Sequence, residues 1–275
     1  MPQKLNGQRI ALFESRLAEE ISALVRRCGG VPVCVPAVRE HRRSAGREMA
    51  AVLDRVRAEP SPVFVFSTGV GASALFGEAR ALGREAELRD AILRGLAVCR
   101  GPKPVAALHK EGITASIRAR SPYTTEEFID ALAQVDVRRR MVVLTHYGEK
   151  NPPLVVALVS RGARLFELML YEWELPEDTG PLARVIEELE GGAFAAAAFT
   201  TQIQARNLMA VAGEVGRKEG LLAALRSRVL VAAVGPTCAR VLKELGIPPQ
   251  VMPESPKMAA MIRALVGRLA EGSPQ

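Results

Sequence analysis

Residues 235–247 form a short unit that occurs twice in the chain, and this repeat constrains the fold more than any other feature. The unit follows an uncharged apolar run, residues 229–234, which is typical of a buried strand. Gly-Pro ends the run, apolar residues then recur at helical spacing, and Gly246 stands where a helix commonly ends. The same order is found 134 positions earlier, in residues 96–113. The sequence therefore predicts a strand, a tight turn and a short helix in each half of the chain.

Other segments of the two halves correspond at a similar offset, and together they predict five strands in each half, alternating with helices. A strand, a helix and a further strand in this order form a parallel sheet. The corresponding segments are Ser121-Pro122 with Ser255-Pro256, Phe66-Ser67-Thr68 with Phe199-Thr200-Thr201, and residues 10–13 with 141–144. The expected strands lie at residues 9–13, 31–36, 63–66, 96–100, 114–117, 141–144, 165–171, 194–199 and 229–234 and near Val251.

Two polar segments indicate how the halves are connected. Residues 38–48 are rich in arginine, and residues 172–178 are polar as well, so each is a natural place for the chain to cross from one domain to the other. The chain of 275 residues is long enough for two domains. We expect an α/β protein in which residues 39–173 form one doubly wound, parallel-sheet domain inserted into another made of residues 1–38 and 174–275. The two crossings would form a two-stranded linker, and the strand ends of the domains would line a cleft.

Localisation and redox state follow from what the chain lacks. No apolar stretch approaches the length of a membrane span, and the first residues lack the apolar region of a signal peptide, so we expect a cytoplasmic protein without membrane contact. The cysteines have no C-x-x-C spacing, and three of them lie in or beside apolar strands. Buried free thiols are therefore predicted rather than disulfides or a metal site. The cysteines are Cys28, Cys34, Cys99 and Cys238.

The charge balance predicts an anionic partner. The formal net charge is +7, and 30 of the 37 basic residues are arginine. Guanidinium groups match the geometry of carboxylates and phosphates, although an arginine-rich, solvated surface has the same composition. The sequence has no basic helix with base-reading spacing, no zinc-finger pattern and no aromatic-rich sheet, so nucleic acid is not expected. A small polyanion fits the charge at least as well.

Common catalytic patterns are missing. The chain has three histidines and no cluster of histidine with carboxylates, which argues against a catalytic metal, and it has no G-x-S-x-G motif. His109 is expected on a solvated helix, and His41 lies in the first crossing. His146 and Tyr147 follow the strand at 141–144, so they are candidates to face the cleft.

One glycine pattern has a nucleotide-binding alternative. Gly69-x-Gly71-x-x-Ala74 follows a strand and matches the dinucleotide fingerprint. However, the strand is in mid-chain, no ribose-binding acid follows at the expected distance, and the corresponding turn at 200–206 lacks the glycines. We interpret the pattern as a tight turn from strand to helix. A nucleotide-dependent enzyme would bind NAD(P) and be stabilised by it.

Four turns at strand ends, each of which opens a helix, predict anion binding. The N-terminus of a helix offers unpaired N–H groups and the positive end of the helix dipole, and hydroxyl groups add donors. The same residues are also ordinary caps and turns, but their recurrence in both halves favours a site for a ligand with several carboxylates. The turns are Ser67-Thr68-Gly69, Gly101-Pro102-Lys103, Thr200-Thr201-Gln202 and Gly235-Pro236-Thr237.

With these motifs in this order, the chain resembles the uroporphyrinogen-III synthase family. A strand ending in Phe-Thr-Ser or similar is matched at residues 66–68 and again at 199–201, and a Tyr on the strand returning to the outer domain is matched by Tyr171. The family's last signature, Val-Gly-Pro-Thr-x-Ala-x-x-Leu-x-x-x-Gly, is matched by residues 234–246. The resemblance covers essentially the whole chain.

This resemblance implies two flavodoxin-like domains, one inserted into the other, and a lyase without cofactor or metal. Hydroxymethylbilane, a linear tetrapyrrole with eight carboxylates, would lose its hydroxyl as water and close into a ring while its last pyrrole is inverted. The enzyme would act by positioning and by acid assistance to the leaving hydroxyl, with Tyr171 as the catalytic donor. A monomer is expected. The implied substrate-binding residues are Ser67, Thr68, Gly69, Arg100, Gly101, Lys103, His146, Tyr147, Thr200, Thr201, Gly235, Thr237 and Cys238.

Two positions depart from the family pattern. The family often has Thr where this chain has Cys238 and Pro104, so each position lacks a hydroxyl donor. These departures motivate an alternative, a non-catalytic relative that binds a tetrapyrrole or another polyanion.

Overall fold

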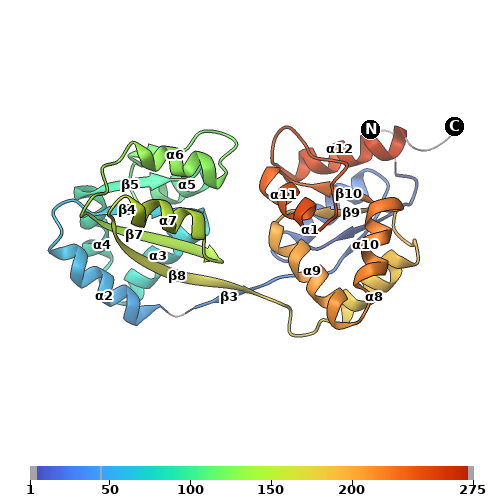
Figure 1. Cartoon of the computed structure of the whole chain (residues 1–275), viewed down its shortest axis with the longest axis horizontal. Helices are drawn as coiled ribbons and strands as arrows, with labels where there is room; N and C mark the ends of the chain where they lie inside the picture. The colour runs from blue at the N-terminus through green and yellow to red at the C-terminus, as the bar shows by residue number, and fades with distance from the viewer. Residues whose placement is uncertain (1–4, 44, 272–275) are drawn as a thin grey trace. The chain divides into compact units, whose positions relative to one another are not determined.

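The computed structural model describes residues 5–43 and 45–271, with the side chains of Arg42 and Tyr147 left out (Figure 1). It divides into two compact units: unit 1 is Met1–Arg39 with Glu174–Gln275, and unit 2 is Glu40–Trp173. The chain passes from one to the other in β3 (Arg39–Arg42) and β8 (Arg164–Glu174), which are neighbours in one sheet. Arg39 belongs to unit 1, one residue beyond the expected boundary.

Unit 1 is built on a parallel sheet of four strands in the order β10-β9-β1-β2. Its central strand β9 has the sequence Ala-Ala-Ala-Phe and is buried throughout, as a strand covered on both faces must be. A parallel bridge between Ala232 and Val251 adds one more pairing beside β10. The strands are β1 (Arg9–Leu12), β2 (Val31–Cys34), β9 (Ala196–Phe199) and β10 (Leu230–Ala233).

Helices cover both faces of the unit 1 sheet (Figure 1). One face packs against α1 (Ala18–Arg27) and α12 (Met258–Glu271). The other packs against α8 (Gly180–Glu190), α9 (Gln202–Glu214), α10 (Lys218–Ser227) and α11 (Pro236–Glu244). The stacked rings of Phe13 and Phe199, with centroids 4.9 Å apart, anchor the carboxyl ends of β1 and β9 in this second core.

Unit 2 holds a sheet of six strands in the order β3-β8-β7-β4-β5-β6. The pairings from β8 to β6 are parallel. Strand β3 runs the other way, because Arg39 pairs with Glu174 while the N–H of Arg43 donates to the carbonyl of Leu170. The remaining strands are β4 (Val63–Phe66), β5 (Leu96–Cys99), β6 (Ile117–Arg118) and β7 (Met141–Gly148).

The unit 2 sheet is also covered on both faces. One core joins it to α2 (Gly46–Arg57), α3 (Gly69–Ala81), α4 (Glu85–Arg94) and α5 (Pro102–Lys110). The other joins it to α6 (Thr125–Ala133) and α7 (Pro152–Ser160). Helix α6 begins with the predicted capping box, in which Glu127 returns its carboxylate to the N–H of Thr124 at 2.8 Å.

Several elements differ from the prediction. Strand β3 lies in the first polar crossing and pairs with β8, as a two-stranded linker requires, whereas α4 and α10 were not predicted. Strand β7 continues to Gly148, four residues beyond its expected end, because β8 pairs with it over that length. Helix α1 begins at Ala18, after Leu17, and has no side-chain cap. The mixed α/β fold with parallel sheets agrees with the sequence.

Candidate functional site

The first group of predicted site residues lies where β4 and β5 of unit 2 lead into α3 and α5. Thr68 caps α3, and its hydroxyl oxygen accepts a hydrogen bond from the N–H of Gly71 at 3.0 Å. A Cβ on Gly69 would lie only 2.8 Å from the carbonyl oxygen of Lys103. Glycine is required here because the start of α3 touches the start of α5. The packing explains the glycine pattern as a strand-to-helix turn and brings the two predicted turns of unit 2 together.

The second turn of unit 2 is shaped by Gly101, the cap of α5. Gly101 is buried, and a Cβ there would meet the ring of Tyr123 at 3.3 Å. Arg100 is partly buried at the end of β5, and burial lowers the pKa of its guanidinium from the ordinary value. Lys103 is exposed in the first turn of α5. The N-terminus of α5 thus carries two cationic side chains, one of them partly desolvated.

The corresponding turn of unit 1 holds a carboxylate of its own. Thr201 caps α9, and the side-chain oxygen of Gln204 accepts from the N–H groups of Thr200 (2.8 Å) and Thr201 (3.2 Å). The Thr200 hydroxyl donates to the Glu14 carboxylate, and the Gln204 amide donates to it at 3.4 Å. Glu14 was not among the site residues predicted from the sequence. Glu14 comes directly after the strand expected at residues 9–13. The predicted site turns also follow strand ends, so this position could have indicated Glu14 as a candidate.

The last predicted turn of unit 1, at the start of α11, contains an accessible residue, Thr237, and is followed by a buried one, Cys238. Gly235 caps α11, and a Cβ there would lie 3.0 Å from the Cβ of Pro256, so the Ser-Pro segment covers this turn as Tyr123 covers Gly101. Thr237 is partly exposed. Cys238 is only 4% exposed and its thiol donates to the carbonyl of Phe199 at 3.6 Å. The thiol of Cys238 therefore faces the interior and is not available to a ligand in this structure, so its assignment as a substrate-binding residue stays a prediction for the backbone alone.

His146 is likewise buried. Its side chain is 1% exposed, and its Nε2 lies 2.7 Å from Glu167 Oε2 on the neighbouring strand β8. Burial, the largest cause, lowers the pKa of His146, although the hydrogen bond to Glu167 works in the opposite direction. The expectation that His146 follows the strand was wrong, because it lies within β7. The side chain of the adjacent Tyr147 lies outside the described part of the chain.

Tyr171 lies within β8, three residues before its end. The side chain is partly buried and packs against the core of unit 2 that includes α2 to α5. The register between β7 and β8 shifts at this point, since His146 pairs with Met169 but Gly148 pairs with Glu172. Bulges of this kind redirect side chains and are common beside active sites. The catalytic role of Tyr171 stays a prediction.

The buried thiols lead to a test of this geometry. Burial raises the pKa of Cys99 and of Cys238 to about 12, so almost none of either thiol is ionised near pH 8. We expect both to resist alkylation in the folded protein, while the partly exposed Cys28 is labelled first. Mass spectrometry of the labelled peptides gives the order, and labelling in urea is the control. Equal labelling rates for all three in the folded protein would contradict the buried positions.

The burial of His146 predicts a pH dependence of stability. Its pKa in the folded state is lower than the ordinary value of 6.5, so below that pH the unfolded chain binds more protons than the folded one. The free energy of unfolding should therefore fall as the pH drops below about 6.5 towards the folded pKa. Urea titrations followed through Trp173, which is in unit 2, should show a weaker fall for His146→Gln. Identical pH slopes for the two proteins would rule out this contribution.

In the described part of the chain, no group of three or more His, Cys, Asp or Glu residues is arranged to hold a metal ion. None of the helices there has the length and apolar character needed to cross a membrane.

Comparisons with known proteins place this geometry in one family. The model of the family described as uroporphyrinogen-III synthase HemD matches residues 19–263. A mutant uroporphyrinogen III synthase from the extremely thermophilic bacterium Thermus thermophilus is 26% identical, with a TM-score of 0.76 over 97% of this chain and 100% of that chain. The synthetase from Helicobacter pylori 26695, at 14% identity, shares the fold with a TM-score of 0.52 over 95% of this chain and 99% of that one.

A relative of Bacillus subtilis (strain 168), the uncharacterized protein YjjA, is 32% identical over 262 residues, which is 95% of this chain and 96% of the relative. The family implies a place in tetrapyrrole biosynthesis. With a family model that spans most of its length and a crystal structure of a synthase that superimposes over 97% of it, the chain belongs to the uroporphyrinogen-III synthase family.

Proposed function

We propose that the protein is a uroporphyrinogen-III synthase, a lyase that closes hydroxymethylbilane into a macrocycle with inversion of the last pyrrole ring and loss of water. The observation that carries this proposal is the family match over residues 19–263. The reaction would need no cofactor. The protein would act as a cytoplasmic monomer on a small polycarboxylate, without nucleic acid or membrane.

The proposed chemistry requires positioning and one proton. When the hydroxyl leaves, its C–O bond breaks and a donor must supply the proton that makes water. The Tyr171 hydroxyl would donate this hydrogen bond or proton. The helix N-termini of α3, α5 and α11 would hold carboxylates through those first-turn N–H groups that remain available, at the positive end of the helix dipole. Closure to the uninverted isomer occurs without an enzyme, so the protein must mainly impose a conformation on the substrate.

We further propose that each unit is a flavodoxin-like domain. When strands are numbered in chain order, the sheet of unit 1 with the Val251 bridge follows the order 2-1-3-4-5. The same order holds for β8-β7-β4-β5-β6 of unit 2 when β7 is counted as its first strand. This is the order of flavodoxin-like sheets, in which ligands bind outside the carboxyl ends of the strands.

The two departures from the family pattern count less against activity than the sequence suggested. Cys238 is buried with its thiol on a backbone carbonyl, and Pro104 is buried in α5. Neither position would present a hydroxyl to a ligand, although Pro104 also lacks the backbone N–H that another residue would offer in the first turn of α5. The missing hydroxyls are therefore a weak argument for the non-catalytic alternative.

The direct test is conversion of hydroxymethylbilane by the purified protein, with separation of the type I and type III isomers after oxidation. We expect the type III isomer as the main product. Type I product alone, formed at the rate without enzyme, would contradict the proposal. Tight binding of a tetrapyrrole together with that result would select the non-catalytic relative.

A further inference from the structure

Four basic side chains gather at one end of the unit 2 sheet. Arg100 follows β5, Lys103 lies in the first turn of α5, Arg118 ends β6, and Arg120 lies two residues further on. Arg118 pairs in register with Cys99, and the N–H of Ala119 donates to the carbonyl of Cys99 at 3.0 Å. These contacts hold β6 beside the end of β5. We call Arg100, Lys103, Arg118 and Arg120 the basic edge.

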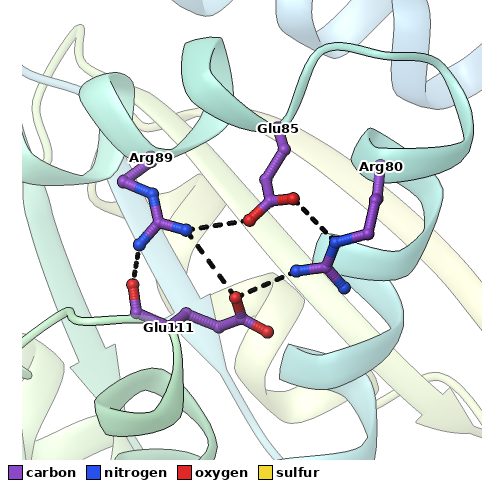
Figure 2. A network of polar contacts seen from close by, with 4 residues as sticks. All are labelled: Arg80, Glu85, Arg89 and Glu111. Carbon is purple, nitrogen blue, oxygen red and sulfur yellow. Dashed lines mark hydrogen bonds and ion pairs between the residues drawn. The ribbon is translucent and has the colours of Figure 1, made fainter.

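The side chains of the basic edge have no acidic partners, in contrast to other arginines of unit 2. Figure 2 shows Arg80 and Arg89 sharing two carboxylates: Arg80 contacts Glu85 at 2.7 Å and Glu111 at 3.1 Å, and Arg89 contacts Glu85 at 2.8 Å. Within the part of the chain that the structure describes, none of the four basic-edge side chains forms an ion pair or a hydrogen bond.

Nearby acidic groups do not neutralise the basic edge. Helix α6, which packs beside β5 and β6, begins with Glu126 and Glu127, and both carboxylates accept hydrogen bonds from Thr124 instead. Arg100 is the most constrained of the four, because it is partly desolvated without an anion. Burying a charge is costly unless it is paired, so an anion from outside would recover part of that cost.

The comparable turn of unit 1 is closed to such an anion. There the Glu14 carboxylate already accepts from the Thr200 hydroxyl and the Gln204 amide. A second carboxylate at this turn would be repelled by the first and would compete for the same donors. Unit 2 differs in that its basic-edge cations lie at the strand ends without an ion pair among the described residues.

We propose that the basic edge binds carboxylates of the substrate, so that Arg100, Arg118 and Arg120 contribute more to its affinity than the Thr200 turn does. This inference rests on the proposed function, because it takes a polycarboxylate tetrapyrrole as the ligand. Guanidinium groups suit it, since each can form two parallel hydrogen bonds with one carboxylate. Arg118 and Arg120 are the binding residues that the sequence did not reveal.

The experiment measures binding of uroporphyrin, an octacarboxylate, by fluorescence at low and high salt. Arg100→Gln is expected to weaken binding about tenfold, as for a hydrogen bond to a charged group. Arg118→Gln and Arg120→Gln should each weaken it about threefold, because exposed charges are screened. Arg138→Gln is the matched control: it removes one exposed charge at the opposite end of the sheet, before β7. Coproporphyrin, a tetracarboxylate, should show smaller effects of all the variants.

The outcomes separate this inference from the proposed function. Weaker binding in the basic-edge variants with unchanged binding in Arg138→Gln supports the inference, even if the protein fails to convert hydroxymethylbilane. Normal binding by Arg118→Gln and Arg120→Gln, or an equal loss in Arg138→Gln, overturns it, even if conversion is normal. These two exposed variants should fold normally, so the test stands even if Arg100→Gln does not.

Discussion

Replacing Tyr171 by Phe is expected to slow formation of the type III isomer about 100-fold while leaving the fold intact. General acid assistance typically contributes between about 100-fold and 10,000-fold, and the hydroxyl of Tyr171 is the group that would supply it. The ring packs against the core of unit 2 and stays in the Phe variant, so the free energy of unfolding should change little. Since closure without the enzyme gives type I, the product mixture should shift towards type I as catalysis weakens.

A second substitution separates the hydroxyl from the ring. Tyr171→Leu also lacks the hydroxyl but loses aromatic packing on β8, so we expect the same loss of activity with an added loss of stability. The isomer ratio and urea midpoint should be measured for both variants. Wild-type turnover in Tyr171→Phe would remove this residue from the mechanism, whereas a slow and unstable Phe variant would assign it a structural role.

The strands that could be predicted from the sequence are those composed of apolar residues, because their composition indicates burial. Strand β4, Val-Phe-Val-Phe, has the predicted bounds, and all four of its residues are buried. Strand β3, Arg-Glu-His-Arg, could not be found in this way, because it has no apolar face. It is held by pairing with β8 and by ion pairs such as Arg43 with Glu172 at 2.9 Å, which are tertiary contacts.

The candidate site could be predicted in its turns but not in the direction of its side chains. The caps Thr68, Gly101, Thr201 and Gly235 all stand at helix starts, because local chemistry determines a cap. Whether a residue beside a cap faces outwards depends on packing partners that are distant in sequence. Cys238 turns to the carbonyl of Phe199, 39 residues away, and buried His146 contacts Glu167, 21 residues away on β8.

The location of the unpaired positive charge at the basic edge could also not be predicted from the sequence. A count of 37 basic and 30 acidic residues gives the excess but not its location. Any of the acidic residues could have lain near Arg118, and only the folded arrangement commits Glu85 and Glu111 to Arg80 and Arg89 (Figure 2). Whether a cluster of basic residues can bind an anion therefore depends on which of them are already paired with acidic residues in the folded chain.

Replacing Gly148 by Ala is expected to destabilise unit 2 by about 3 kcal/mol. Gly148 has φ +78°, in the left-handed region, which costs another residue about 1–2 kcal/mol. A Cβ there would lie 1.9 Å from the Trp173 ring, so the indole must also move, and such overpacking typically costs about 1–3 kcal/mol. Trp173 is the single tryptophan of the chain, so its fluorescence reports the displacement directly, and the urea midpoint gives the stability.

The same substitution should reduce activity, because Trp173 and Tyr171 are only two residues apart on β8. A displaced indole would shift the strand that carries the Tyr171 hydroxyl, and misplacement of about 1 Å can cost about 100-fold in rate. Gly46→Ala is the matched control: a Cβ there meets nothing within 4 Å, so stability should stay equal or rise by about 0.5 kcal/mol. If Gly148→Ala kept wild-type fluorescence and stability, the indole would not lie against Gly148, and the coupling of Trp173 to Tyr171 would lose its basis.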